Sequence, residues 1–159
     1  MLFLLAFGLP LALATPPSGA PPSAAPTALA NGERVAAEAL ITALYAPYLR
    51  EGAKTPELRE ALPWAPALEA AWAKAAADPE GGQAAPGFDP FIDAQDYQLT
   101  GLRVAARREA DGQLVVVASF LNFGEPQSIA YHLVGAGAAW KVADVVGRGG
   151  SLLKTLQRW

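Results

Sequence analysis

Residues 113–134, which read QLVVVASFLNFGEPQSIAYHLV, decide the fold. Two runs rich in β-branched and aromatic residues, Gln113–Asn122 and Gln127–Val134, are separated by Asn122-Phe123-Gly124-Glu125-Pro126. β-Branched and aromatic residues favour strands, whereas Gly and Pro favour turns. Alternation in the second run predicts two faces, with Ile129, Tyr131 and Leu133 on one and Ala130, His132 and Val134 on the other. The stretch therefore predicts two antiparallel strands joined by a short turn.

Two further runs of the same kind, Leu99–Arg107 and Ala139–Val146, flank this hairpin. They are separated from it by Asp111-Gly112 and Gly135-Ala136-Gly137, which are turn sequences. Four successive strands with short turns predict a four-stranded antiparallel meander. Beyond Gly147–Gly150 a short closing helix is predicted from the spacing of the apolar residues Leu152, Leu153, Leu156 and Trp159.

Upstream of the sheet the apolar residues follow a helical period. Between Gly32 and Tyr48 they form a stripe of Ala37, Leu40, Ile41, Leu44, Tyr45 and Tyr48. Pro47 is expected to end or kink this helix because it lacks an N–H. A second helical region is predicted to begin at Thr55-Pro56-Glu57, and a further one carries Leu68 and Trp72.

Helices followed by hairpins predict an α+β domain, with amino-terminal helices packed on one face of a curved four-stranded sheet and a short carboxy-terminal helix. The apolar residues 1–14, MLFLLAFGLPLALA, are too few to span a bilayer but have the length of a signal-peptide core. Ala12-Leu13-Ala14 supplies the small-x-small cleavage pattern. Residues 15–30, TPPSGAPPSAAPTALA, predict a disordered tether, which leaves residues 31–159 as the single domain. We therefore expect a secreted or periplasmic protein with no stable membrane span after signal removal.

Composition excludes several kinds of site. The 159 residues include no cysteine, which excludes disulfides, cysteine nucleophiles and thiolate metal sites. The single histidine, His132, excludes a two-histidine metal site. With 12 basic and 15 acidic residues the net charge is −3, so nothing indicates nucleic-acid binding. No cofactor is predicted.

Several motifs together resemble those of one family. They are FDPFIDAQD at 88–96, LVVVASFLNFGEP at 114–126, YHLV at 131–134, WKVADV at 140–145 and SLL at 151–153. Over about Val35 to Leu156 the chain resembles a family of exported bacterial domains of unknown function. That family looks like part of the nuclear-transport-factor-like, or cystatin-like, superfamily, in which helices and a bent sheet form an open cone. The resemblance implies this fold and an extracytoplasmic location, and it transfers no catalytic residue.

The densest polar cluster contains Asp89, Asp93 and Asp96. Their spacing lacks the alternate carboxylates and the invariant glycine of an EF-hand, so metal binding by these three residues is the weaker interpretation. Asp89 directly before Pro90 is typical of an N-cap followed by proline at the first helical position. The stronger interpretation is therefore structural, with Asp89 beginning a helical turn and Asp96 closing the loop into the first strand.

Large aromatic side chains could fill the core or line a mostly apolar pocket. Alternation would place Trp140, Val142 and Asp144 on one face of the last strand, so Asp144 is the carboxylate expected nearest such a pocket. The predicted ligand-binding residues are Tyr48, Trp72, Tyr131, His132, Trp140 and Asp144. The chain has no G-x-S-x-G elbow for a Ser–His–Asp triad, and no catalytic residue is predicted.

Two functions stay open. The first is a secreted or periplasmic non-enzymatic module that binds a small apolar ligand or an envelope protein. The second is a small acid–base enzyme of the isomerase or hydratase type, with Asp144, Tyr48 and His132 inside the cone. A monomer or a closed homodimer is expected, because arginines at 103, 107 and 108 protect the edge strand from open-ended pairing.

Overall fold

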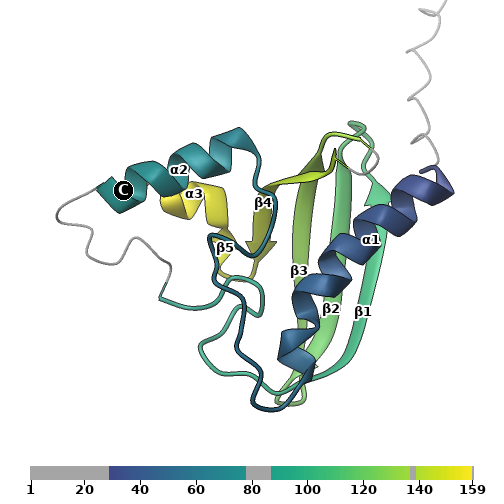
Figure 1. Cartoon of the computed structure of the whole chain (residues 1–159). Helices are drawn as coiled ribbons and strands as arrows, with labels where there is room; N and C mark the ends of the chain where they lie inside the picture. The colour runs from purple at the N-terminus through teal and green to yellow at the C-terminus, as the bar shows by residue number, and fades with distance from the viewer. Residues whose placement is uncertain (1–28, 78–86, 137–138, 159) are drawn as a thin grey trace, which may run out of the picture.

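The computed structural model describes residues 29–77, 87–136 and 139–158, and the predicted signal peptide and nearly all of the predicted tether lie outside them. The described residues form an α+β fold of α-helices, one 3₁₀ helix (η1) and an antiparallel sheet (Figure 1). In chain order the elements are α1 (Asn31–Tyr45), η1 (Pro47–Leu49), α2 (Pro66–Ala77), β1 (Leu99–Arg108), β2 (Leu114–Asn122), β3 (Glu125–Val134), β4 (Lys141–Gly147), β5 (Gly150–Ser151) and α3 (Leu152–Leu156). None of the helices in these ranges has the length and apolar character required to cross a membrane.

The first predicted helix is confirmed, whereas the second is wrong. Helix α1 ends just before Pro47, which begins η1, and its apolar stripe is buried. No helix begins at Thr55-Pro56-Glu57. The chain forms turns there instead, and one of them is closed by a hydrogen bond from the Glu60 N–H to the Glu57 carbonyl (2.9 Å). Pro56 and Pro63 enclose residues 57–62, a segment too short to form a stable helix.

The sheet has five strands, not the four predicted, in the order β1-β2-β3-β4-β5, and all neighbours are antiparallel. The additional strand β5 pairs with the end of β4 through a tight turn in which Gly150 has a φ of 97°. A left-handed backbone of this kind favours glycine. A strand of two residues has no alternation to reveal it, which explains why the sequence pattern missed β5.

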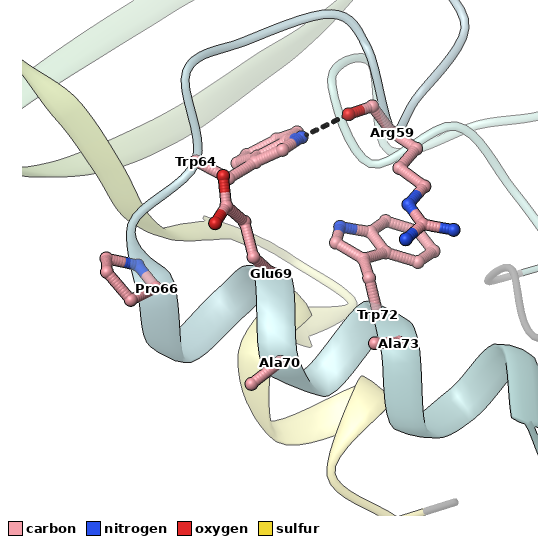
Figure 2. Close-up of a pocket in the computed structure, with 7 residues that line it drawn as sticks. All are labelled: Arg59, Trp64, Pro66, Glu69, Ala70, Trp72 and Ala73. Atoms are coloured by element: carbon pink, nitrogen blue, oxygen red, sulfur yellow. Dashed lines mark hydrogen bonds between the residues drawn. The ribbon is translucent and has the colours of Figure 1, made fainter.

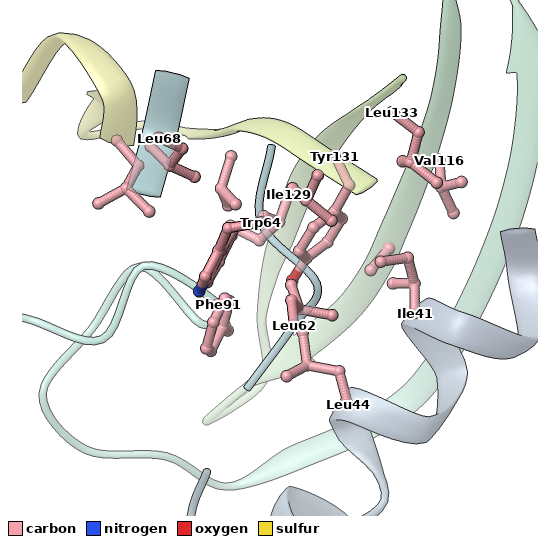
Figure 3. Close-up of a cluster of buried hydrophobic side chains, with 14 of the residues drawn as sticks. Ile41, Leu44, Leu62, Trp64, Leu68, Phe91, Val116, Ile129, Tyr131 and Leu133 are labelled. Atoms are coloured by element: carbon pink, nitrogen blue, oxygen red, sulfur yellow. The ribbon is translucent and has the colours of Figure 1, made fainter. Parts of the chain in front are cut away.

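The helices cover two parts of the sheet. Helix α1 lies across β1 and β2, while α2 and α3 pack on each other and on β4 (Figure 1). Between them lies one core, in which Ile41 and Leu44 of α1 approach Tyr131 of β3, with Trp64 and Phe91 beside them (Figure 3). The prediction that Ile129, Tyr131 and Leu133 share one face is confirmed, and the structure shows that this face is buried.

Strand β4 contains an irregularity that changes where its side chains face. Leu133 pairs with Val142 and His132 pairs with Asp144, so Ala143 is an extra residue on β4. Such a bulge shifts the alternation by one residue. Asp144 consequently leaves the face of Val142 and joins that of His132, and the prediction that Trp140, Val142 and Asp144 share a face is wrong.

A segment far away in the sequence pairs with the free side of β4. The Ala65 N–H donates to the Val142 carbonyl, and the Val142 N–H donates to the Pro63 carbonyl, both at 2.8 Å. Trp64 thereby forms a parallel bridge with Val142. Because Pro66 then begins α2, this bridge fixes the start of that helix against the sheet.

Candidate functional site

Tyr131 lies in the core with Tyr45. The Tyr45 hydroxyl donates to the Phe91 carbonyl at 2.6 Å and lies 2.8 Å from the Tyr131 hydroxyl. Both side chains are fully buried, and burial is the main cause that raises the pKa of each phenol well above its ordinary value. These phenols therefore stay protonated and hold the core together.

Tyr48 is paired with Asp89. Its hydroxyl donates to one carboxylate oxygen of Asp89, and the Phe91 N–H donates to the other at 2.8 Å. No helix follows, so the expected helix start is wrong, but Asp89 does begin a turn, in which the Ile92 N–H donates to the Asp89 carbonyl at 3.2 Å. The Asp89 N–H donates to the Ala94 carbonyl at 2.9 Å, which closes a compact turn. Burial raises the pKa of Asp89 against the opposing effect of these hydrogen bonds.

The three clustered aspartates have separate partners. The Asp93 carboxylate accepts the Gly149 N–H at 3.2 Å and lies 3.8 Å from Arg148, while Asp96 uses its backbone carbonyl to accept from Asn122. Across the described ranges no three His, Asp or Glu residues gather as metal ligands would. The structure therefore does not bring Asp89, Asp93 and Asp96 together into one site.

Asp144 and His132 are neighbours across the β3–β4 pair but have different roles. Asp144 accepts from the Leu153 N–H at 3.0 Å and from the Ser151 hydroxyl at 2.5 Å, and Ser151 in turn accepts the Lys154 N–H. These contacts cap the start of α3. His132 places Nδ1 2.7 Å from the side-chain oxygen of Gln113. Tyr48 makes its contact with Asp89 instead, so the predicted Asp144–Tyr48–His132 group is not assembled.

Trp72 lines a groove of about 540 Å³ between α2 and the loop that precedes it. Figure 2 shows the Arg59 guanidinium pointing toward the Trp72 indole, and the Glu69 carboxylate on the other side next to Trp64. The groove is lined by Arg59, Trp64, Pro66, Glu69, Ala70, Trp72 and Ala73. Its volume falls in the range of small-molecule sites.

The polar groups of this groove are only partly satisfied. The Trp64 indole N–H donates to the Arg59 carbonyl at 2.8 Å. Trp72 is 6% exposed, and its buried indole N–H has no hydrogen-bond partner among the residues that the structure describes. Within the described residues, no carboxylate pairs with the Arg59 guanidinium. A buried donor without a partner is unfavourable, so the groove lacks an acceptor that a ligand could supply.

Trp140 lines a second groove, of about 320 Å³, and its indole N–H likewise has no partner in the described part of the chain. The cation of this groove, Arg108, already donates to the Gly112 carbonyl and to Glu33. Arg108 is therefore already paired, whereas Arg59 has no carboxylate partner among the described residues. The α2 groove is for this reason the better candidate for a ligand site.

Sequence patterns missed Arg59, Trp64 and Glu69 as site residues. Arg59 and Trp64 lie in the stretch that was expected to be helical, and they meet α2 only because the Trp64 bridge folds this stretch onto β4. The signal that could have found them is the pair of prolines around Trp64, in Pro63-Trp64-Ala65-Pro66, which marks an extended segment before a helix.

The chain was compared with known protein families, proteins and structures. No protein-family model, curated protein or solved structure matches the chain. The resemblance to exported domains of unknown function therefore stays a prediction.

Proposed function

We propose that this domain is a non-enzymatic binding module that takes a small ligand in the α2 groove. The buried, unpartnered indole N–H of Trp72 in a groove that also contains Arg59 carries the proposal. The groove combines apolar residues with the charged side chains of Arg59 and Glu69, and polar groups of this kind orient a ligand in a binding site. An envelope protein that presents the same chemistry is the alternative occupant.

Binding has more support than acid–base catalysis. Among the described residues, Asp89 and Tyr48 form the one hydrogen-bonded Asp–Tyr pair, and both oxygens of that carboxylate already accept hydrogen bonds. Tyr48 itself is 3% exposed. Asp144, the carboxylate of the alternative hypothesis, is occupied in capping α3. A general acid or base needs access to its substrate, which these contacts do not provide.

A groove-filling substitution tests the proposal. Ala70 and Ala76 are both exposed on α2, but only Ala70 lines the groove. A ligand found by screening small molecules against the purified chain should, at a hundred times its Kd, raise Tm by roughly 5 to 10 °C. We expect Ala70→Phe to abolish this shift and Ala76→Phe to preserve it, as measured by thermal unfolding.

The screen has two results that would overturn the proposal. One is that no small molecule from the panel or from an envelope extract raises Tm. The other is that ligands raise Tm equally in the wild type and in Ala70→Phe, because they then bind elsewhere.

We also propose that the chain is exported and that its helices and sheet form the cystatin-like cone implied by the resemblance. The apolar residues 1–14 and Ala12-Leu13-Ala14 support export. Expression of the whole chain in a bacterium should give a periplasmic or secreted protein beginning at Thr15, as read by amino-terminal sequencing. Recovery of only the uncleaved chain inside the cell would contradict this.

A further inference from the structure

We propose that the ligand of the α2 groove is a small carboxylate with an apolar body, whose oxygens are held by Arg59 and by the Trp72 indole N–H. The inference rests on the proposed function and names the class of ligand. It starts from the hydrogen-bonding groups that the groove leaves open.

The open groups are mainly donors. A guanidinium carries five N–H groups in a planar fork that matches a carboxylate, and it accepts nothing. The Trp72 indole also only donates. Figure 2 shows its nitrogen at the end of the ring nearer to Trp64 and Glu69, while the Arg59 guanidinium lies beside the other end of the indole. Two donor side chains that line one groove favour an oxyanion, because charge-assisted hydrogen bonds are the strong ones.

Access to the indole nitrogen requires side-chain movement. The nitrogen is buried, although other atoms of Trp72 line the groove. Arg59 and Glu69 flank it in the groove lining and are both exposed, so their long side chains can rotate to admit an oxygen atom. Glu69 lies one turn before Trp72 on α2 and makes no hydrogen bond to its indole N–H, which is left for a ligand to accept.

Glu69 also limits the charge of the ligand. A second negative charge in the same groove repels an anion, and it repels a dianion more than a monoanion. A carboxylate therefore fits better than a phosphate. Its body would lie against Pro66, Ala70 and Ala73, which are apolar.

Nuclear magnetic resonance of the indole groups tests this directly. The chain has four tryptophans, so a ¹⁵N-labelled full-length sample gives a small set of indole N–H signals. Titration with benzoate should shift the Trp72 signal downfield to saturation, because its N–H gains an acceptor. The Trp140 signal, from an unpartnered indole in the other groove, should stay in place. Neutral benzamide and dianionic phenyl phosphate should bind at least tenfold more weakly.

Matched variants separate the contacts from general damage to the fold. Trp72→Phe keeps an aromatic ring but removes the N–H, and it should weaken benzoate binding about tenfold. Trp140→Phe is the same change in the other groove and should leave affinity unchanged. Arg59→Gln should weaken binding at least tenfold, whereas Glu69→Gln should strengthen it several-fold by removing repulsion. Thermal unfolding of each variant confirms that it is folded.

Different failures have different meanings. Equal binding of benzoate and benzamide, or an unchanged affinity in Arg59→Gln, would overturn the carboxylate inference while the binding module stands. Tighter binding of phenyl phosphate than of benzoate would identify a phosphate ligand and overturn the choice of carboxylate. Failure of benzoate to shift Trp72, together with an Ala70→Phe-sensitive neutral ligand in the thermal screen, would contradict the ligand class only.

Discussion

Replacing Phe91 by alanine is expected to lower the free energy of unfolding by roughly 4 kcal/mol, the range for a buried aromatic residue. Phe91 is fully buried and stacks on Trp64 at 6.3 Å between ring centroids and on Tyr131 at 6.4 Å. Loss of its ring leaves a cavity between the helices and β3. Urea unfolding, followed by tryptophan fluorescence, measures the change.

Phe123 provides the matched control. It is 59% exposed at the turn between β2 and β3, where its φ is 50°. Phe123→Ala should change stability by only about 0.5 kcal/mol. Because Phe91→Ala removes a large part of a typical domain's stability, Phe91→Leu offers a milder variant with an expected loss of about 1 to 2 kcal/mol. Similar losses at positions 91 and 123 would show that the Phe91 stack is not central to the core.

Replacing Asp89 by alanine is expected to cost about 2 to 4 kcal/mol. The change leaves the Tyr48 hydroxyl, which is nearly fully buried, and the Phe91 N–H without their acceptors. Asp89→Asn is the control, because its side chain can still accept from Phe91 and bond to Tyr48. It should cost much less than alanine at neutral pH, as measured by urea unfolding of all three proteins.

The same pair of proteins predicts a pH dependence. Burial raises the pKa of the Asp89 carboxyl in the folded chain above its ordinary value of 3.8. The folded state then holds this proton more tightly than the unfolded chain does. The stability of the wild type relative to Asp89→Asn should be highest below the ordinary pKa, and it should fall as pH rises through the raised value. A relative stability that rises over this interval would contradict the cause given for the pKa shift.

Much of the fold follows from local patterns. The alternation in β3 and the apolar stripe of α1 both depend on residues that are near in sequence, so each was predictable. The extra residue Ala143 was not, because a bulge is specified by the pairing of two strands rather than by the pattern of one. This single residue moved Asp144 away from the face on which alternation placed it.

The candidate site was less predictable, because its residues meet only through the tertiary structure. Trp72 was among the predicted ligand-binding residues and does line a groove. Tyr131 is also a large aromatic residue, but it packs in the core. The residue types alone do not show which of Trp72 and Tyr131 lines a groove. Arg59 reaches the same groove only after the bridge at Trp64 has formed.

That bridge also has a consequence for the order of folding. The hairpins of the sheet close over short turns, whereas pairing Trp64 with Val142 closes a loop of roughly 80 residues. Closing the longer loop costs more conformational entropy, so this contact forms more slowly. We expect an intermediate in which the meander is formed but the loop before α2 has not docked. Such an intermediate has a sheet and no groove, so a ligand would bind only the completed fold and would protect its last-formed part from opening.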